Sequence, residues 1–218
     1  MTLTESLQSA LENGFRQIGQ LSIHPIDEGY LLCHLDDSGK VGSGDHSDLV
    51  RHTDPADAIE IGLYDESGRY RFTKGEISLK SGWVFELFDV AGLRQTLDHF
   101  YPASLGLWKA WKGGELHVQN LRDKLDRQTG MYRHSGKVSD AGAQEVIRET
   151  CGPSKRCSKR ILWQIDEETP LEESEASRFD GILNGKSEPE AIPLVCQEAC
   201  NHFVAQCRGK AKEEFEKG

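Results

Sequence analysis

Four cysteines in the second half of the chain form two local pairs, and their thiols are suited to binding soft metals. Cys151 and Cys157 are separated by five residues, and Cys196 and Cys200 by three. A cubane iron–sulfur cluster needs four thiolates, one for each iron, and each pair lets a short segment wrap one side of it. The long segment 158–195 adds only a loop-closure entropy that grows as the logarithm of its length. The pattern therefore favours a [4Fe–4S] cluster bound by these four cysteines.

Zinc is the main chemical alternative, because it also binds four thiolates. Structural zinc sites usually begin with a pair about two to four residues apart, so the longer spacer between Cys151 and Cys157 favours iron–sulfur. Buried or redox-active thiols are a third interpretation. Basic residues gather around the first pair in a chain of formal net charge −10: Arg148, Lys155, Arg156, Lys159 and Arg160. They would stabilise an anionic cluster, or form a solvated face or a docking patch for an acidic partner.

A last helix is expected from Pro193 onward, with proline in its first turn. On such a helix Cys207 lies on the same face as Cys196 and Cys200, because residues three and four apart are neighbours. We therefore expect Cys207 to be a buried core thiol beneath the cluster, and the alternative is that it replaces one of the four ligands. His202 projects off that face, toward solvent or just outside the ligand set.

The composition excludes several classes of protein. The 218 residues are 37% hydrophobic, enough for a core, and no stretch approaches the roughly 20 apolar residues of a membrane span. The first twenty residues lack the apolar run of a signal peptide, so we expect a cytoplasmic protein with reduced thiols. The acidic balance argues against nucleic acid or a membrane surface as partner. Cys33, flanked by leucines, is expected to be a core thiol.

The first half has the alternating elements of a small α+β domain, assigned to residues 1–112. An apolar stripe from Leu3 to Ile18 predicts the first helix, and a second helical pattern ends before Pro102. The remaining expected elements are strands 21–23, 30–35 and 82–87, a hairpin over 59–73, helical turns within 45–52 and the helix 90–100. Gly113-Gly114 is the expected boundary between two domains.

The second half, residues 113–218, is expected to be mainly helical. Leucines at 116, 121 and 125 mark one helix, and Ser139 is a plausible N-cap for a helix over 140–150. Residues 166–189 are rich in acidic side chains and predict a solvated connection. The predicted fold class is therefore α+β, with a small N-terminal α+β domain packed on a mainly helical iron–sulfur domain.

The cysteine spacing resembles that of the [4Fe–4S] centre in sirohaem-containing sulfite and nitrite reductases. A closer resemblance is to the iron–sulfur region appended to some CbiX-type sirohydrochlorin chelatases, carried by residues 129–133, 151–163 and 193–200. The preceding segment resembles the small stabilising domain that accompanies that region. This second likeness rests on Tyr70-Arg71, Gly82-Trp83, Leu97-Asp98 and Tyr101-Pro102.

The resemblance implies an accessory iron–sulfur module rather than a chelatase. The chelatase domain has no counterpart, and the eight histidines are scattered without a close pair. Four cysteine ligands would leave no iron open to substrate, so we expect no catalytic residues and predict a role in one-electron transfer, redox sensing or stabilisation. The implied partner is a tetrapyrrole chelatase or a redox protein. A zinc-stabilised interaction module and a tetrapyrrole-binding, chelatase-related enzyme remain the alternatives, and Trp163 is equally a shield for the cluster or ordinary core.

Overall fold

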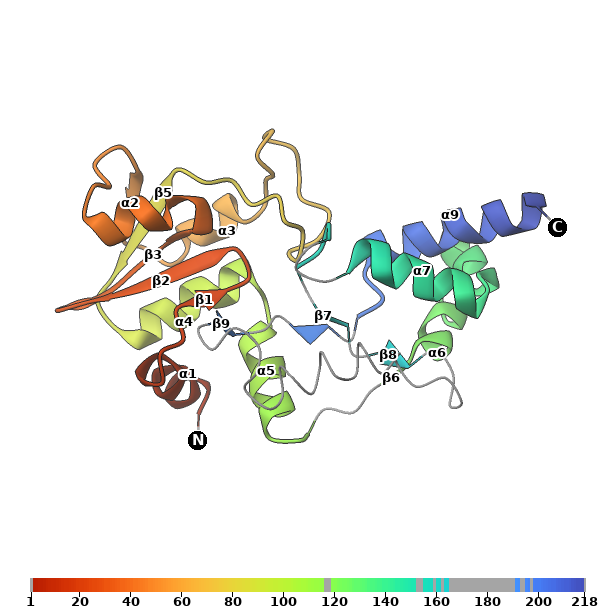
Figure 1. The fold of residues 1–218 in the computed structure, drawn as a ribbon, viewed down its shortest axis with the longest axis horizontal. Helices are drawn as coiled ribbons and strands as arrows, with labels where there is room; N and C mark the ends of the chain where they lie inside the picture. Colours follow the sequence, from red (N-terminus) through yellow and green to blue (C-terminus); the bar gives the residue numbers. More distant parts are fainter. Residues whose placement is uncertain are drawn as a thin grey trace.

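The computed structural model describes residues 2–115, 119–151, 155–158, 160–161, 163–164, 191–192, 195–196 and 198–217. A mixed sheet with its helices forms one end of the molecule, and a group of helices forms the other (Figure 1). The α+β class expected from the sequence is confirmed. Among the described helices, none is both long and apolar enough to cross a lipid bilayer. Below, residues 2–115 are called the N-terminal region and the described residues from 119 onward the C-terminal region.

The largest sheet has six strands in the order β4-β5-β3-β2-β1-β9. These are β1 (Gln17–Ile18), β2 (Leu21–Ile26), β3 (Gly29–His34), β4 (Val50–His52), β5 (Trp83–Leu87) and β9 (Ala191–Ile192). The hairpin β2–β3 runs in register from Leu21 opposite His34 to Ile26 opposite Gly29. The short strand β9 pairs in parallel with β1, so a segment of the C-terminal region completes the sheet of the N-terminal region.

Helices α1 (Leu3–Glu12), α4 (Val90–Phe100), α5 (Ser104–Lys112) and the short α3 (Asp57–Ile61) share one buried core with the sheet. Helix α2 (Ser38–Ser43) follows the 3-10 turn Leu35–Asp37 and packs on β2 and β3 through a separate small cluster. Thr2 caps α1 in a capping box with Glu5 three residues later, the spacing typical of that motif. The core beneath the helices is aromatic at its centre. Phe100 is fully buried, stacks on Trp83 at 5.0 Å and meets Phe85 edge to face at 5.9 Å.

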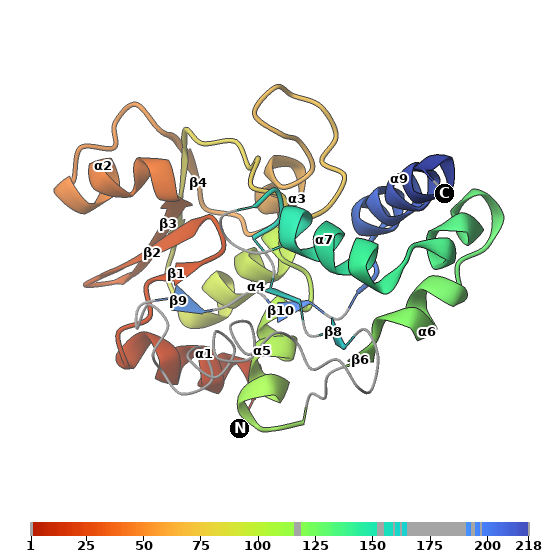
Figure 2. The same ribbon diagram turned by 45° about the vertical axis from the view of Figure 1, so that its right-hand side comes forward.

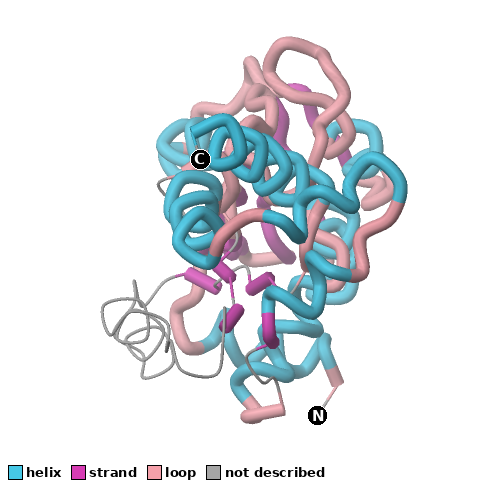
Figure 3. Tube along the Cα trace, turned by 90° about the vertical axis from the view of Figure 1, so that its right-hand side faces the viewer, coloured by secondary structure: helices cyan, strands magenta, loops and turns pink. Residues whose placement is uncertain are grey.

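The C-terminal region has its own buried cluster, built by α6 (Leu121–Asp126), the 3-10 segment Gly130–Lys137, α7 (Asp140–Thr150) and α9 (Asn201–Lys217). Helices α7 and α9 lie side by side (Figure 2). Viewed from the end, these helices stand in front of the sheet (Figure 3). Two short parallel pairs complete the region: β7 (Arg160–Ile161) with β10 (Val195–Cys196), and β6 (Gln119–Asn120) with β8 (Trp163–Gln164).

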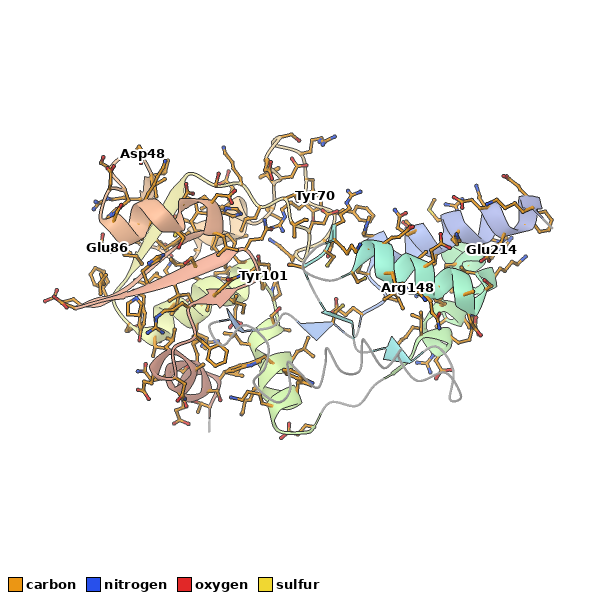
Figure 4. All side chains as sticks on the ribbon, in the orientation of Figure 1. Asp48, Tyr70, Glu86, Tyr101, Arg148 and Glu214 are labelled. Carbon is orange, nitrogen blue, oxygen red and sulfur yellow. The ribbon has the colours of Figure 1, made fainter. Side chains whose placement is uncertain are left out.

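One residue joins the start of α7 to the end of α9. Ser139, the predicted N-cap, accepts a hydrogen bond at Oγ from the Gly142 N–H at 2.9 Å. The same residue donates from its backbone N–H and its hydroxyl to the Glu214 carboxylate, at 2.8 and 2.6 Å. Glu214 lies on the last helix, α9 (Figure 4). The cap therefore also fixes the packing of α7 against α9.

We expect Ser139→Ala to lower the free energy of unfolding by about 1 kcal/mol, because the Gly142 N–H loses its acceptor and Glu214 loses one of its two donors from Ser139. Urea unfolding followed by circular dichroism measures the change. Ser47→Ala, in an exposed loop, is the matched control and should stay within about 0.5 kcal/mol of the parent. Equal stability of both variants would contradict the role assigned to the cap.

Several sequence predictions for individual elements are wrong. The first helix ends at Glu12, and Ile18 belongs to β1. The segment 45–52, predicted to form helical turns, contains the strand β4 instead. The first strand of the hairpin predicted over 59–73 should begin at Ile59, but that residue belongs to α3. Tyr64 does pair with Tyr70 across the turn of that segment. The last helix begins at Asn201, not at Pro193, and continues to Lys217. Residues 116–118 and the acidic segment 166–189 lie outside the described residues.

His34 makes the stability of the fold sensitive to pH. Its side chain is buried, and burial lowers the pKa of His34 from 6.5, opposed in part by Asp36 and Asp37. Because the unfolded chain then binds the proton more tightly than the folded one, this contribution to stability is complete above about pH 6.5 and is lost as the pH falls below it. We expect the free energy of unfolding to fall between about pH 7 and pH 5 and the fall to be smaller in His34→Gln, both measured by urea unfolding. An unchanged pH dependence in the variant would contradict this assignment.

Candidate metal centre

The four cysteines singled out by their spacing come together in the structure. Cys151, Cys157, Cys196 and Cys200 all line one small cavity. The other residues around it are Thr73, Thr150, Glu198, His202 and Phe203. Within the described part of the chain, no three acidic, histidine or cysteine side chains meet closely enough to hold a single metal ion. The four thiols are therefore arranged around a space rather than at one point.

The first pair is positioned by the end of α7. Cys151 is the residue at which the helix ends, and its N–H donates to the carbonyl of Ile147 at 2.9 Å. The chain then turns back, because the Cys157 N–H donates to the carbonyl of Thr150 at 3.0 Å and the two cysteines form a short bridge. This return brings two thiols that are six positions apart to the same side of the cavity.

The second pair is positioned by β10 and by the start of α9. Cys196 pairs with Ile161 of β7, and Cys200 immediately precedes the helix. Two backbone N–H groups point at the sulfur atoms: Glu198 donates to Cys196 Sγ at 3.4 Å, and Phe203 donates to Cys200 Sγ at 3.5 Å. In iron–sulfur centres, such donors to sulfur raise the reduction potential. Cys200 also lies at the N-terminal, positive end of the α9 dipole.

The four thiols cannot all ionise without a nearby positive charge. Burial raises the pKa of Cys151, and the other three cysteines of the cavity raise it further. Like charges in a poorly solvated site disfavour one another, so the ionised tetrad requires a cation among the sulfur atoms. The donor set thus fits a metal centre with sulfur preference, including an iron–sulfur cluster.

The remaining predicted residues fall in different places. Cys207 is fully buried among the apolar side chains of the C-terminal core and does not line the cavity, and burial raises its pKa to about 12. Cys33 is fully buried in the N-terminal region, as predicted. His202 is 5% exposed and lines the cavity, so of its two expected places the structure has the one just outside the ligand set rather than solvent. The side chain of Trp163 is outside the described part, and its predicted roles stay predictions.

The basic residues around the first pair do not form one uniform layer. Lys155 and Arg156 are exposed, and Arg156 forms an ion pair with the buried Glu76 at 3.1 Å. Arg148, on the exposed side of α7 (Figure 4), donates to Gln144 at 3.2 Å. Lys159 and the side chain of Arg160 lie outside the described part. Arg156 is therefore a link between the two regions as well as a surface charge.

No sequence pattern predicts that the N-terminal region reaches the cavity. The loop 71–77 contributes Thr73 to its wall. The same loop pairs with the segment of the first cysteines. Ser158 donates from N–H and Oγ to the Gly75 carbonyl at 2.7 and 3.0 Å, and the Ile77 N–H donates to the Arg156 carbonyl at 2.9 Å. These partners are about eighty positions apart, so no local pattern could have revealed the contact.

Comparisons with known proteins agree with this arrangement. Residues 4–112 match the family described as the DR2241 stabilising domain, and residues 113–209 match the family described as the 4Fe-4S iron-sulfur cluster binding domain. No curated protein matches. Among solved structures the chain is similar to DR2241 from Deinococcus radiodurans, described as a multi-domain protein with structural similarity to chelatases and two additional novel domains.

The likeness to DR2241 has a TM-score of 0.71 with 22% sequence identity, and it covers 97% of this chain. It covers 42% of DR2241, so the chain spans less than half the length of that protein. At this identity the likeness shows similarity of fold alone. The family follows from the two family matches: the chain belongs to the DR2241 stabilising domain family and has a 4Fe-4S iron–sulfur cluster binding domain in its second half.

Proposed function

We propose that Cys151, Cys157, Cys196 and Cys200 are the ligands of the [4Fe–4S] cluster and that the protein is an accessory module for one-electron transfer. The observation that carries the proposal is that all four thiols line one cavity. The number of thiols equals the number of irons in a cubane cluster. We also propose that the chain is divided into domains at residues 112 and 113, each with its own buried core.

The residues around the cavity suit electron transfer better than catalysis. When bound, the cluster supplies a site that accepts and releases one electron. The Glu198 and Phe203 N–H groups hold two of the four sulfur atoms, and the Thr73 and Phe203 side chains cover the cavity. With one cysteine for each iron, no iron is open to a substrate. We therefore assign no catalytic residue.

We further propose that the electron partner belongs to tetrapyrrole metabolism. Support comes from DR2241, whose description notes structural similarity to chelatases. The present chain covers 42% of that protein, and its cysteine cavity is the feature that we expect such a partner to use. A tetrapyrrole chelatase or its redox donor is thus the expected partner.

Two measurements on anaerobically purified protein test this function. Dithionite should bleach the broad absorbance near about 400 nm, and mild oxidation should restore it through repeated cycles, as a one-electron carrier requires. Titration with sirohydrochlorin, followed by metal-insertion assays of the chain alone, tests the alternative that the protein is a tetrapyrrole-binding, chelatase-related enzyme. Metal insertion by the isolated chain would show a chelatase-related enzyme, and a cluster that is destroyed on its first reduction would contradict electron transfer.

A further inference from the structure

Arg71 is a buried cation on the loop that reaches the metal centre. Its side chain is 4% exposed, and burial lowers its pKa, although a guanidinium remains charged at neutral pH. Nη2 donates to the backbone carbonyl of Glu76 at 2.5 Å. Within the described residues, Nε and Nη1 have no hydrogen-bond partner. Tyr70, the residue before it, lies on the loop between α3 and β5 that reaches toward α7 (Figure 4).

A buried charge of this kind is costly unless another charge compensates it. Among the described groups, Tyr101, Glu76, Cys157 and Asp65 each favour the charged form of Arg71 electrostatically. Tyr101 supplies no charge at neutral pH, because burial raises its pKa to about 12.

The two carboxylates near Arg71 already have arginine partners of their own. Glu76 pairs with Arg156 at 3.1 Å, and its other oxygen accepts the Phe72 N–H at 3.2 Å. Asp65 pairs with Arg69 at 3.6 Å and also accepts the Arg69 N–H at 2.8 Å. Neither carboxylate therefore serves Arg71 alone, and Cys157, on the thiol side of the metal centre, is a further group that acts on it.

The backbone fixes this relationship. Glu76 forms a bridge with Cys157 itself, next to the Gly75–Ser158 and Ile77–Arg156 hydrogen bonds. The loop that carries Arg71 is thereby held against the segment that carries the proposed ligand Cys157, and Nη2 is anchored to that loop through the Glu76 carbonyl. The guanidinium is therefore bound to the same residue, Glu76, whose backbone pairs with Cys157.

We propose that the iron–sulfur cluster is the counterion of Arg71, so that the N-terminal region sets the reduction potential through a positioning residue. The inference rests on the ligands proposed above. A four-thiolate [4Fe–4S] centre is anionic in both usual oxidation states and gains one negative charge on reduction. A buried cation beside it favours the reduced form, with little screening by solvent.

The test is the reduction potential of cluster-loaded variants, compared only among preparations with the same iron and sulfide content per chain as the parent. Arg71→Gln should shift the reduction equilibrium about tenfold toward the oxidised form. For a one-electron couple this corresponds to a reduction potential about 59 mV lower than that of the parent. Arg71→Lys should recover most of that shift. Arg69→Gln, which removes an arginine that is 81% exposed on the same loop, is the matched control and should leave the potential unchanged.

Glu76→Gln distinguishes an electrostatic effect from a structural one. Removing this negative charge beside Cys157 should raise the potential, opposite to the effect of Arg71→Gln. Loosening of the loop or entry of water would move both variants in the same direction, and that result, or an unchanged potential in Arg71→Gln, would overturn the proposal. If Arg71→Gln fails to fold, the reduction potentials of Arg71→Lys and Glu76→Gln decide the matter. A potential near that of the parent in Arg71→Lys, together with a raised potential in Glu76→Gln, supports the proposal. A lowered potential in Glu76→Gln overturns it. Failure of the ligand assignment would appear instead as absent iron in the parent protein.

Discussion

Cys157→Ser is expected to abolish the cluster. The thiol lines the cavity beside the other three, and its backbone is fixed by hydrogen bonding to Thr150 and by the bridge to Glu76. A serine hydroxyl is a much weaker ligand for cluster iron than a thiolate. Iron in the purified variant should fall from about four per chain to below about one, and the absorbance near about 400 nm should disappear. Iron analysis and an absorption spectrum of anaerobic protein measure both.

Cys207→Ser is the matched control for that loss. Cys207 is fully buried in the same region but stands away from the cavity, between apolar side chains of the C-terminal core. The variant should lose some stability, because a hydroxyl is placed in an apolar site, and should keep its iron. Loss of the cluster in Cys207→Ser, with retention in Cys157→Ser, would overturn the ligand set.

Phe100→Ala is expected to cost about 3–5 kcal/mol of unfolding free energy. Its ring is fully buried and packs against both Trp83 and Phe85, so truncation leaves a cavity in the aromatic centre of the N-terminal core. Because β5 and α4 meet there, the damage should spread to the sheet. Urea unfolding followed by tryptophan fluorescence measures the loss.

Phe88→Ala is the control for the aromatic core. Phe88 follows β5 directly but is 74% exposed, so its truncation removes the same atoms without opening a cavity. We expect a change within about 0.5 kcal/mol of the parent protein. Equal losses in the two variants would show that burial in the aromatic core is not what holds the N-terminal region.

The sequence was sufficient for features that depend on local order. The N-cap Ser139 and the spacing within each cysteine pair are read from residues a few positions apart, and the structure contains the cap and brings the members of each pair to one cavity. The role of the cysteines as ligands remains a prediction, as does the division of the chain at residue 112.

Features that depend on distant pairing were not accessible. The start of the last helix was misplaced because Val195 and Cys196 pair with β7, and a proline near a helical pattern does not reveal such pairing. Residues 59–61 alternate in polarity as a strand would, yet they form α3, since a short apolar run fits both periods. The contact of loop 71–77 with the cysteine segment joins residues about eighty positions apart, and Arg71 carries no local signal of its place.

The most direct test of the account is to determine iron, acid-labile sulfide and zinc on one anaerobically purified sample of the chain. We predict about four irons and about four sulfides per chain, with zinc at background. About one zinc per chain with no sulfide would contradict the account and would make the four thiols a structural zinc site.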